Sequence, residues 1–308
     1  MRILISGASG FLGTHLTRVL KQQGNTVARL ARPQSERAIG DVSWDPLAGT
    51  IDTASIEGTD ALVHLSGANI GQRRWTARQK AILRSSRVDS TRVLVDALAR
   101  LQQRPRVFLC ASATGYYGDR GEEVLAESSG PGTDFLSLVA RDWEAEALRA
   151  ERSGVRTLPL RFGMILSSEG GALLRMLWPF RLGIGGRFGN GRQWMSWIAL
   201  DDAVQAVCSA LVNTSLDGPV NVVSPNPVRN AEFVRILARV LNRPALLPAP
   251  ALALRLALGE MADPLLLASQ RVRPAVLQAA NFAFRFPDLP AALLSLLARP
   301  NESELEGT

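Results

Sequence analysis

The sequence predicts an α/β fold of the Rossmann type, a doubly wound parallel sheet followed by a small, mainly helical C-terminal region. Three observations lead to this prediction. Short apolar runs alternate with helical patterns up to Arg161, a glycine-rich turn joins the first run to the first helix, and the rhythm changes after Arg161. Strands alternating with helices imply right-handed crossovers and a sheet covered on both faces.

The expected strands are continuous apolar runs, and helical spacing follows most of them. Strands are predicted at 3–5, 27–30, 61–65, 107–110, 155–160 and 220–223, and helices at 11–20, 76–102 and about 135–153. Residues 1–162 are expected to form a dinucleotide-binding domain that segments at about 195–223 complete. Residues 163–300 are expected to form a substrate-binding region, and the polar, acidic residues 301–308 a disordered tail.

The composition is that of an ordinary globular enzyme, with 46% hydrophobic and 20% charged residues in a chain of 308. The net charge is +7, and nearly all the cations are arginines scattered along the chain. A solvated arginine-rich surface, with a few arginines at a phosphate site, explains this pattern better than nucleic-acid binding does. Two cysteines without a CxxC pair indicate a reducing compartment, and two histidines are too few for a metal site.

The sequence also indicates a cytoplasmic protein without membrane contact. The short apolar run after Arg2 is not a signal peptide. The apolar stretch 245–268 is interrupted by prolines and charged residues, so it cannot span a bilayer, and we interpret it as packed helices. The expected partner is a small-molecule substrate, and a homodimer is left open.

The strongest motif is a glycine-rich turn between the first strand and the first helix. It places Gly7, Gly10 and Gly13 at the spacing of a dinucleotide-binding turn. The first glycine allows a tight turn, the second lets the backbone approach a pyrophosphate, and the third lets the helix pack on the strand. Free amides at the helix start then face the phosphates. The predicted contacts of this turn also include Ser9, Phe11 and Leu12.

The end of the second predicted strand distinguishes between the two nicotinamide cofactors. Sites for NAD place an Asp or Glu there to bind the ribose 2′-hydroxyl, whereas this chain has Arg32. A carboxylate would repel a 2′-phosphate, and a guanidinium can bind it through two hydrogen bonds. The sequence therefore predicts NADP(H); the alternative is that Arg32 is simply an exposed cation.

Several further motifs identify a family resemblance. The turn, the strand end His64-Leu65-Ser66-Gly67-Ala68 and the segment 112–118 resemble the extended short-chain dehydrogenase/reductases, and more specifically the YfcH-like epimerase family. Asp142-Trp143-Glu144 and Gly191-Arg192-Gln193-Trp194 add to this resemblance, which runs from Met1 to about Leu297. It implies that Leu65, Ser66, Gly67, Arg87 and Phe162 contact the cofactor. For Leu65 the alternative is core packing, and for Arg87 a surface charge.

The resemblance leaves the catalytic residues open. Ordinary members of the superfamily carry a serine or threonine and a Tyr-x-x-x-Lys pair on one helix, in which the tyrosine transfers a proton. Here the matching helix has Phe135 or Leu136 near the tyrosine position and Val139 or Ala140 near the lysine position. The serine is present as Ser112, and the only tyrosines of the chain are Tyr116 and Tyr117. We expect Ser112 to orient a substrate oxygen and Tyr116 or Tyr117 to supply the acid, although packing is an equal alternative for the tyrosines.

Other residues are weaker candidates. Trp194 and Trp197 could form the floor of a substrate pocket or part of the core, and Asp201 and Asp202 fit helix caps. Two functions therefore remain. The first is an NADP(H)-dependent oxidoreductase or epimerase acting on a small, nucleotide-linked substrate. The second is a regulatory protein that senses NADP(H) and catalyses little.

Overall fold

The computed structural model describes residues 1–35, 38 and 40–298. The predicted disordered tail, 301–308, lies outside the described residues. None of the helices in those ranges combines the length and the hydrophobicity that a bilayer-spanning segment needs.

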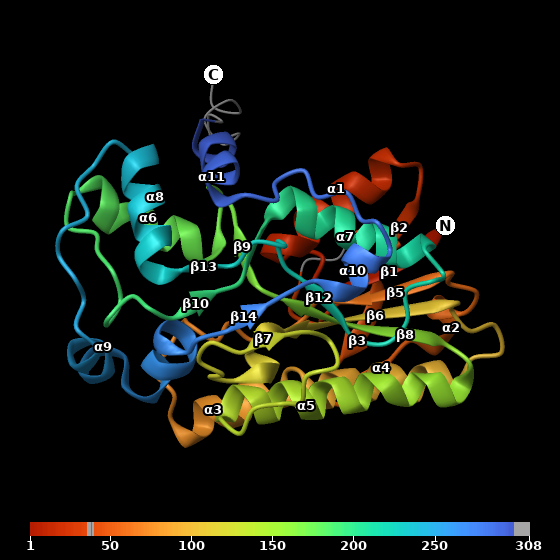
Figure 1. Cartoon of the computed structure of the whole chain (residues 1–308). Helices are drawn as coiled ribbons and strands as arrows, with labels where there is room; N and C mark the ends of the chain where they lie inside the picture. The colour runs from red at the N-terminus through yellow and green to blue at the C-terminus, as the bar shows by residue number, and fades with distance from the viewer. Residues whose placement is uncertain (36–37, 39, 299–308) are drawn as a thin grey trace. The chain divides into compact units, whose positions relative to one another are not determined.

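The described chain alternates strands and helices in its first half, as expected (Figure 1). The strands are β1 (Arg2–Ser6), β2 (Thr26–Ala31), β3 (Val42–Asp45), β4 (Thr50–Ile51), β5 (Ala61–His64), β6 (Val107–Ala113), β7 (Val124–Leu125), β8 (Arg156–Phe162), β9 (Met164–Leu166), β10 (Trp194–Met195), β11 (Trp197–Ala199), β12 (Val220–Val222), β13 (Val228–Arg229) and β14 (Arg271–Val272). The helices are α1 (Phe11–Gln22), α2 (Thr53–Ile56), α3 (Ala77–Ser85), α4 (Val88–Arg100), α5 (Phe135–Leu148), α6 (Gly171–Arg181), α7 (Leu200–Val212), α8 (Asn230–Val240), α9 (Ala251–Leu258), α10 (Ala275–Ala279) and α11 (Leu289–Ala298).

The main sheet has eight strands in the order β12-β8-β6-β5-β1-β2-β3-β4. The pairs β1–β2, β1–β5, β2–β3 and β5–β6 are parallel, and β4 adds an antiparallel edge to β3. Sequence order reverses at β1, which has β2 on one side and β5 on the other. In open α/β sheets, ligands bind outside the carboxyl ends of the strands at such a reversal. The predicted fold class is confirmed.

The strand register brings four strand ends to one level. Ser6 of β1 lies opposite Leu30 of β2 and His64 of β5, and His64 lies opposite Cys110 of β6. The residues that directly follow these positions therefore share one edge of the sheet. The predicted cofactor turn, the strand end of β5 and Ser112 all lie at this edge.

The described chain divides into two compact units. The first unit comprises residues 1–116, 135–161 and 204–220, and the second comprises residues 117–134, 162–203 and 221 onward. The division differs from the sequence-based boundary at 162 because residues 117–134 belong to the second unit. The segment at 195–223 contributes β12 to the main sheet, whereas β11 pairs with β9 in a separate two-stranded sheet.

The first unit has its core between the sheet and helices α4 and α5, while α1 covers the opposite face (Figure 1). The second unit has its own core, in which α6, α8 and α11 pack around Trp197 and Phe233. Each unit therefore buries apolar surface independently, as expected of a cofactor domain with an appended region.

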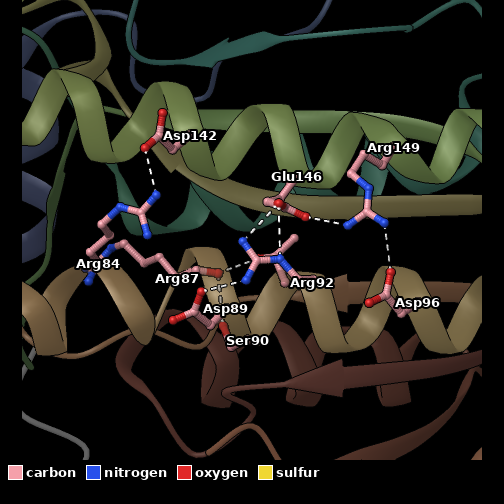
Figure 2. Close-up of polar contacts among 10 residues, drawn as sticks. Arg84, Arg87, Asp89, Ser90, Arg92, Asp96, Asp142, Glu146 and Arg149 are labelled. Carbon is pink, nitrogen blue, oxygen red and sulfur yellow. Dashed lines mark hydrogen bonds and ion pairs between the residues drawn. The ribbon is translucent and has the colours of Figure 1, made fainter. Parts of the chain in front are cut away.

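A polar network joins the exposed edges of α3, α4 and α5 in the first unit (Figure 2). Glu146 of α5 accepts hydrogen bonds from Arg92 at 3.1 Å and from Arg149 at 2.7 Å. Arg84 also reaches Asp142 at 3.0 Å. Exposed pairs of this kind contribute up to about 1 kcal/mol each, so the network adds modestly to the packing of α4 on α5.

One expectation about the second unit holds only in part. Residues 245–268 were expected to form packed helices; Met261 and Ala262 are buried, whereas α9 has no buried residue. The reason lies in its sequence, Ala-Leu-Ala-Leu-Arg-Leu-Ala-Leu, which is apolar on nearly every side. Such a sequence indicates a helix without indicating which face is covered.

Candidate cofactor and active site

The glycine turn between β1 and α1 packs backbone directly against backbone. Gly7 has φ +71°, and a Cβ there would lie 2.9 Å from the carbonyl carbon of Leu65. A Cβ on Gly13 would lie 2.1 Å from the Gly7 carbonyl oxygen. Neither contact leaves room for a side chain, so the turn depends on glycine at both positions.

The start of α1 has the properties of a phosphate cradle. Its N-cap is Gly10, so no side chain caps the first amides, and its first turn carries no carboxylate. Ser9 and Gly10 are exposed, and Phe11 and Leu12 are half-buried. Uncapped amides and the positive end of the helix dipole favour an anion here, so these residues fit the pyrophosphate of a dinucleotide.

Arg32 is well placed for a second phosphate. It directly follows β2, is exposed, and its guanidinium forms no hydrogen bond or ion pair with the residues that the structure describes. Asp41, which precedes the neighbouring strand β3, could have opposed such a role. However, Arg29 binds both of its carboxylate oxygens, at 2.9 and 2.6 Å, and this lowers the pKa of Asp41. That carboxylate is therefore already neutralised.

The loop after β5 is held by a half-buried cation. Arg87 donates to the carbonyl oxygen of Ala68 at 3.0 Å and to that of Leu83 at 3.1 Å. Its guanidinium lies against Gly67, where an added Cβ would be 3.2 Å away, and over the ring of Trp143. Burial lowers the pKa of Arg87 to about 10. No carboxylate of the described chain pairs with this cation, so an anionic cofactor would be a favourable neighbour.

Leu65 and Ser66 directly follow β5. They lie against Gly7 of the glycine turn and precede Gly67, which contacts Arg87. Leu65 donates its backbone N–H to the carbonyl oxygen of Ser6 at 3.1 Å, which extends the β1–β5 ladder to the turn. Both residues are half-buried. Their predicted contact with the cofactor stays a prediction, as does that of Phe162, the half-buried last residue of β8.

A buried polar cluster lies at the C-terminal end of β6, and the sequence reasoning missed two of its members. Ser112 Oγ donates to Glu144 Oε1 at 2.6 Å. Arg161 binds the same carboxylate with Nε at 2.8 Å and Nη2 at 2.7 Å. The three residues are 4%, 5% and 2% exposed, respectively. A bidentate pair of this kind holds the carboxylate rigidly and fixes the direction of the serine hydroxyl.

The two tyrosines have different environments. The ring of Tyr116 is half-buried, and the guanidinium carbon of Arg161 lies 3.6 Å from its centroid. Tyr117 is fully buried in the second unit, where its hydroxyl is 2.7 Å from Asn221 Oδ1 and 3.0 Å from the Ala126 carbonyl oxygen. Tyr116 thus belongs to the Ser112 cluster, whereas Tyr117 is engaged in the core.

The weaker candidates of the second unit have structural contacts. Trp194 donates to Glu122 at 2.9 Å, and the guanidinium groups of Arg229 and Arg271 both contact its ring. Trp197 is buried in the core. Asp202 does not cap its own helix, because its carboxylate accepts from the backbone amides of residues 285 and 286.

Signals for the missed pair were present in the sequence. Glu144 ends the motif Asp142-Trp143-Glu144, which the resemblance had used only as a family mark. Arg161 is a charge within residues 157–161, the part of β8 that is buried throughout. Charged residues are almost never fully buried unless paired, so a charge in a strand expected to be buried could have suggested that it has an ion-pair partner.

Comparison with known proteins shows what this chain resembles. The model of the NAD dependent epimerase/dehydratase family matches residues 3–223, and a domain of unknown function matches residues 249–296. An epimerase family protein of Mycobacterium leprae is 42% identical over 98% of this chain and 97% of its own length.

Two solved structures are also similar. Human epimerase family protein SDR39U1, solved with NADPH, has 32% identity and a TM-score of 0.89 over 97% of this chain and 100% of that one. A nucleoside-diphosphate sugar epimerase from Corynebacterium glutamicum has 36% identity and a TM-score of 0.79 over 96% of this chain and 57% of that one. The NADPH of the human structure agrees with the cofactor that Arg32 predicts.

Proposed function

Because this chain belongs to the NAD dependent epimerase/dehydratase family, we propose that it is an NADP(H)-dependent oxidoreductase or epimerase. Its proposed substrate is a small, nucleotide-linked molecule, a class supported by the nucleoside-diphosphate sugar epimerase that it resembles. The observation that carries the proposal is the cluster of Ser112, Glu144, Arg161 and Tyr116 at the sheet edge that holds the glycine turn.

NADP(H), when bound, supplies or takes up a hydride at its nicotinamide ring. Gly7, Gly10 and Gly13 would hold its pyrophosphate, and Arg32 its 2′-phosphate. The amides of the α1 N-terminus and the exposed guanidinium are separate anion sites at neighbouring strand ends. Both are needed for a phosphorylated dinucleotide.

Ser112 has one role that its hydrogen bond defines. Its proton is directed at Glu144, so the lone pairs of its oxygen are left to accept a hydrogen bond from a substrate hydroxyl. Arg161 keeps the carboxylate in place on the other side. The serine therefore orients a substrate oxygen without moving itself.

Tyr116 is the proposed proton donor and acceptor. The guanidinium of Arg161 lies against its ring, 3.6 Å from the centroid, and holds the phenol in the cluster that contains Ser112. In this arrangement Arg161 takes the place of the absent lysine of the Tyr-x-x-x-Lys pair. Tyr117 is a poorer choice, because its hydroxyl already contacts Asn221 and Ala126.

A matched set of variants tests the chemistry. NADPH carrying deuterium at the transferred position would be incubated with a panel of oxidised nucleoside-diphosphate sugars, and deuterium in the products would be measured by mass spectrometry. We expect transfer by the wild type and by Tyr117→Phe, and a loss of about 100-fold or more in Tyr116→Phe and Ser112→Ala. Equal transfer by Tyr116→Phe and the wild type would refute the role of Tyr116.

The cofactor preference is tested separately. We expect NADPH to bind more tightly than NADH, and Arg32→Ser to weaken NADPH binding by roughly 10- to 100-fold while leaving NADH unchanged. Lys21→Ser, which removes an exposed cation at the far end of α1, is the matched control. Tighter binding of NADH by the wild type would overturn the assignment.

A second function is favoured by one observation, the absence of the usual tyrosine and lysine on α5. Phe135 or Leu136 stands near the tyrosine position and Val139 or Ala140 near the lysine position, and none of these side chains can transfer a proton. On this reading the protein senses NADP(H) without turnover. Tight NADPH binding together with no deuterium transfer to any member of the panel would favour it over the enzyme.

A further inference from the structure

The second unit exposes a group of leucines that the function above does not use. Leu246, Leu247, Leu252 and Leu256, the leucine surface, are 79%, 58%, 68% and 71% exposed. The last two lie on α9, which buries none of its residues. Single exposed leucines are common, but four strongly exposed leucines within residues 246–256 indicate a site of interaction.

The leucine surface continues onto a neighbouring strand-like segment. Ile184 pairs with Ala245, and Phe188 pairs with Ala249, so residues 184–188 run beside residues 245–249. Ile184 is itself 54% exposed. The apolar area is therefore built from two segments that are distant in sequence and adjacent in space.

A groove lined by arginines borders this surface. Its volume is about 790 Å³, and its lining includes Arg187, Arg235, Arg239 and Arg243 together with Leu246. No Asp or Glu lines it, and all four arginines are exposed. Three of them form no ion pair with any residue in the described ranges, and Arg235 has only a 3.7 Å contact with Glu232.

We propose that this face docks the protein onto a bilayer that carries anionic phospholipid headgroups. The leucines enter the boundary between headgroups and acyl chains, and the arginines bind the lipid phosphates. Leu246 belongs to both features, so the arginine groove and the leucine surface meet at this residue. Charge complementarity selects the occupant, because a groove of four arginines without a carboxylate attracts an anionic surface.

The mode of attachment is peripheral. The helix α9 has only eight residues, far fewer than a spanning helix needs. Such a contact differs from the expectation of no membrane contact, because an exposed apolar helix can bind a bilayer surface without spanning it. It is independent of the catalytic cluster, because none of its residues belongs to that cluster or to the glycine turn.

Co-sedimentation with vesicles tests the proposal on the full chain. We expect binding to vesicles of phosphatidylcholine mixed with phosphatidylglycerol, little binding to phosphatidylcholine alone, and weakening by salt. Arg239→Gln with Arg243→Gln should weaken binding on the order of 30-fold. Leu252→Ser with Leu256→Ser should weaken it on the order of 100-fold.

Matched controls come from exposed residues elsewhere. Leu294→Ser on α11, and Arg100→Gln with Arg152→Gln in the first unit, should bind vesicles as the wild type does. Circular dichroism would verify that each variant is folded. Failure of the wild type to sediment with anionic vesicles would overturn the proposal, as would equal binding by the paired leucine or arginine variants. A dimer that the leucine variants dissociate, without vesicle binding, would assign this face to a second copy of the chain instead.

Discussion

Lowering the pH from 7.5 to 5 should destabilise this protein through one residue, His64. It ends β5 and is fully buried. Its ring nitrogens lie 2.5 Å from Ser6 Oγ and 3.2 Å from Ser90 Oγ. Burial, and secondarily the positive charge of Arg87, lower the pKa of His64 from 6.5 to about 3. The folded protein therefore keeps this histidine neutral, whereas the unfolded chain protonates it below pH 6.5.

The sign and size of the effect follow from the two pKa values. The stabilising contribution is fully present above pH 6.5 and is lost as the pH falls toward 3, because only the unfolded chain gains the proton. Lowering the pH from 7.5 to 5 therefore reduces the free energy of unfolding by the equivalent of about 1.5 pKa units, which is about 2 kcal/mol. That is a large share of the free energy of unfolding of a typical domain.

Urea unfolding of the cofactor-free protein at a series of pH values measures this loss. The chain has only two histidines, so His64→Gln and the control His15→Gln separate their contributions. The control should keep the pH dependence of the wild type. The free energy of unfolding of the wild type should exceed that of His64→Gln by about 2 kcal/mol less at pH 5 than at pH 7.5. Carboxyl groups are common to all three proteins and cancel in this comparison.

A second measurement does not need the variant to fold. The ring proton resonance of His64 in the wild type should show no titration between pH 7.5 and 5. A titration near 6.5, or an unchanged pH dependence in His64→Gln, would refute the reasoning.

Three further outcomes are expected. Gly13→Ala should abolish cofactor binding in a calorimetric titration, because the new Cβ meets a carbonyl oxygen, while Gly24→Ala, which has open space, should bind normally despite its strained φ of +80°. Normal binding by the first variant would contradict the backbone contact. Glu144→Gln should lower the free energy of unfolding by about 3–5 kcal/mol, because it leaves a buried arginine unpaired; a loss below about 1 kcal/mol in urea would contradict this. Burial raises the pKa of the Cys110 thiol and that of Cys208, the latter to about 11, so Ellman's reagent at pH 8 should react with neither until the protein is denatured. Rapid reaction of a native thiol would count against that burial.

The features that local sequence could predict are those that local geometry decides. The glycine turn needs a fixed spacing between one strand and the next helix, so Gly7, Gly10 and Gly13 were sufficient to predict it. The prediction of NADP(H) was equally local, because it depended on one position, where Arg32 stands in place of a carboxylate. These predictions required only the order of elements along the chain.

The missed features depend on contacts between distant elements. Glu144 lies on α5 and Arg161 on β8, and their pairing with Ser112 of β6 arises only when the helix crosses over the sheet. The exposure of α9 was missed for another reason. Hydrophobicity on all sides of a helix indicates that the helix is buried. The sequence could not show that the rest of this chain leaves every residue of α9 at least partly exposed.

Arg32 has a consequence for how such a protein changes over generations. Its side chain is exposed and forms no hydrogen bond or ion pair with the rest of the described chain, so replacing it costs the fold almost nothing. The glycines of the turn have no such freedom, because any larger residue meets backbone. A substitution that removes dinucleotide binding at the turn therefore also disturbs the fold. The preference for NADP(H) over NAD(H), in contrast, can change through a single mutation that leaves the fold intact.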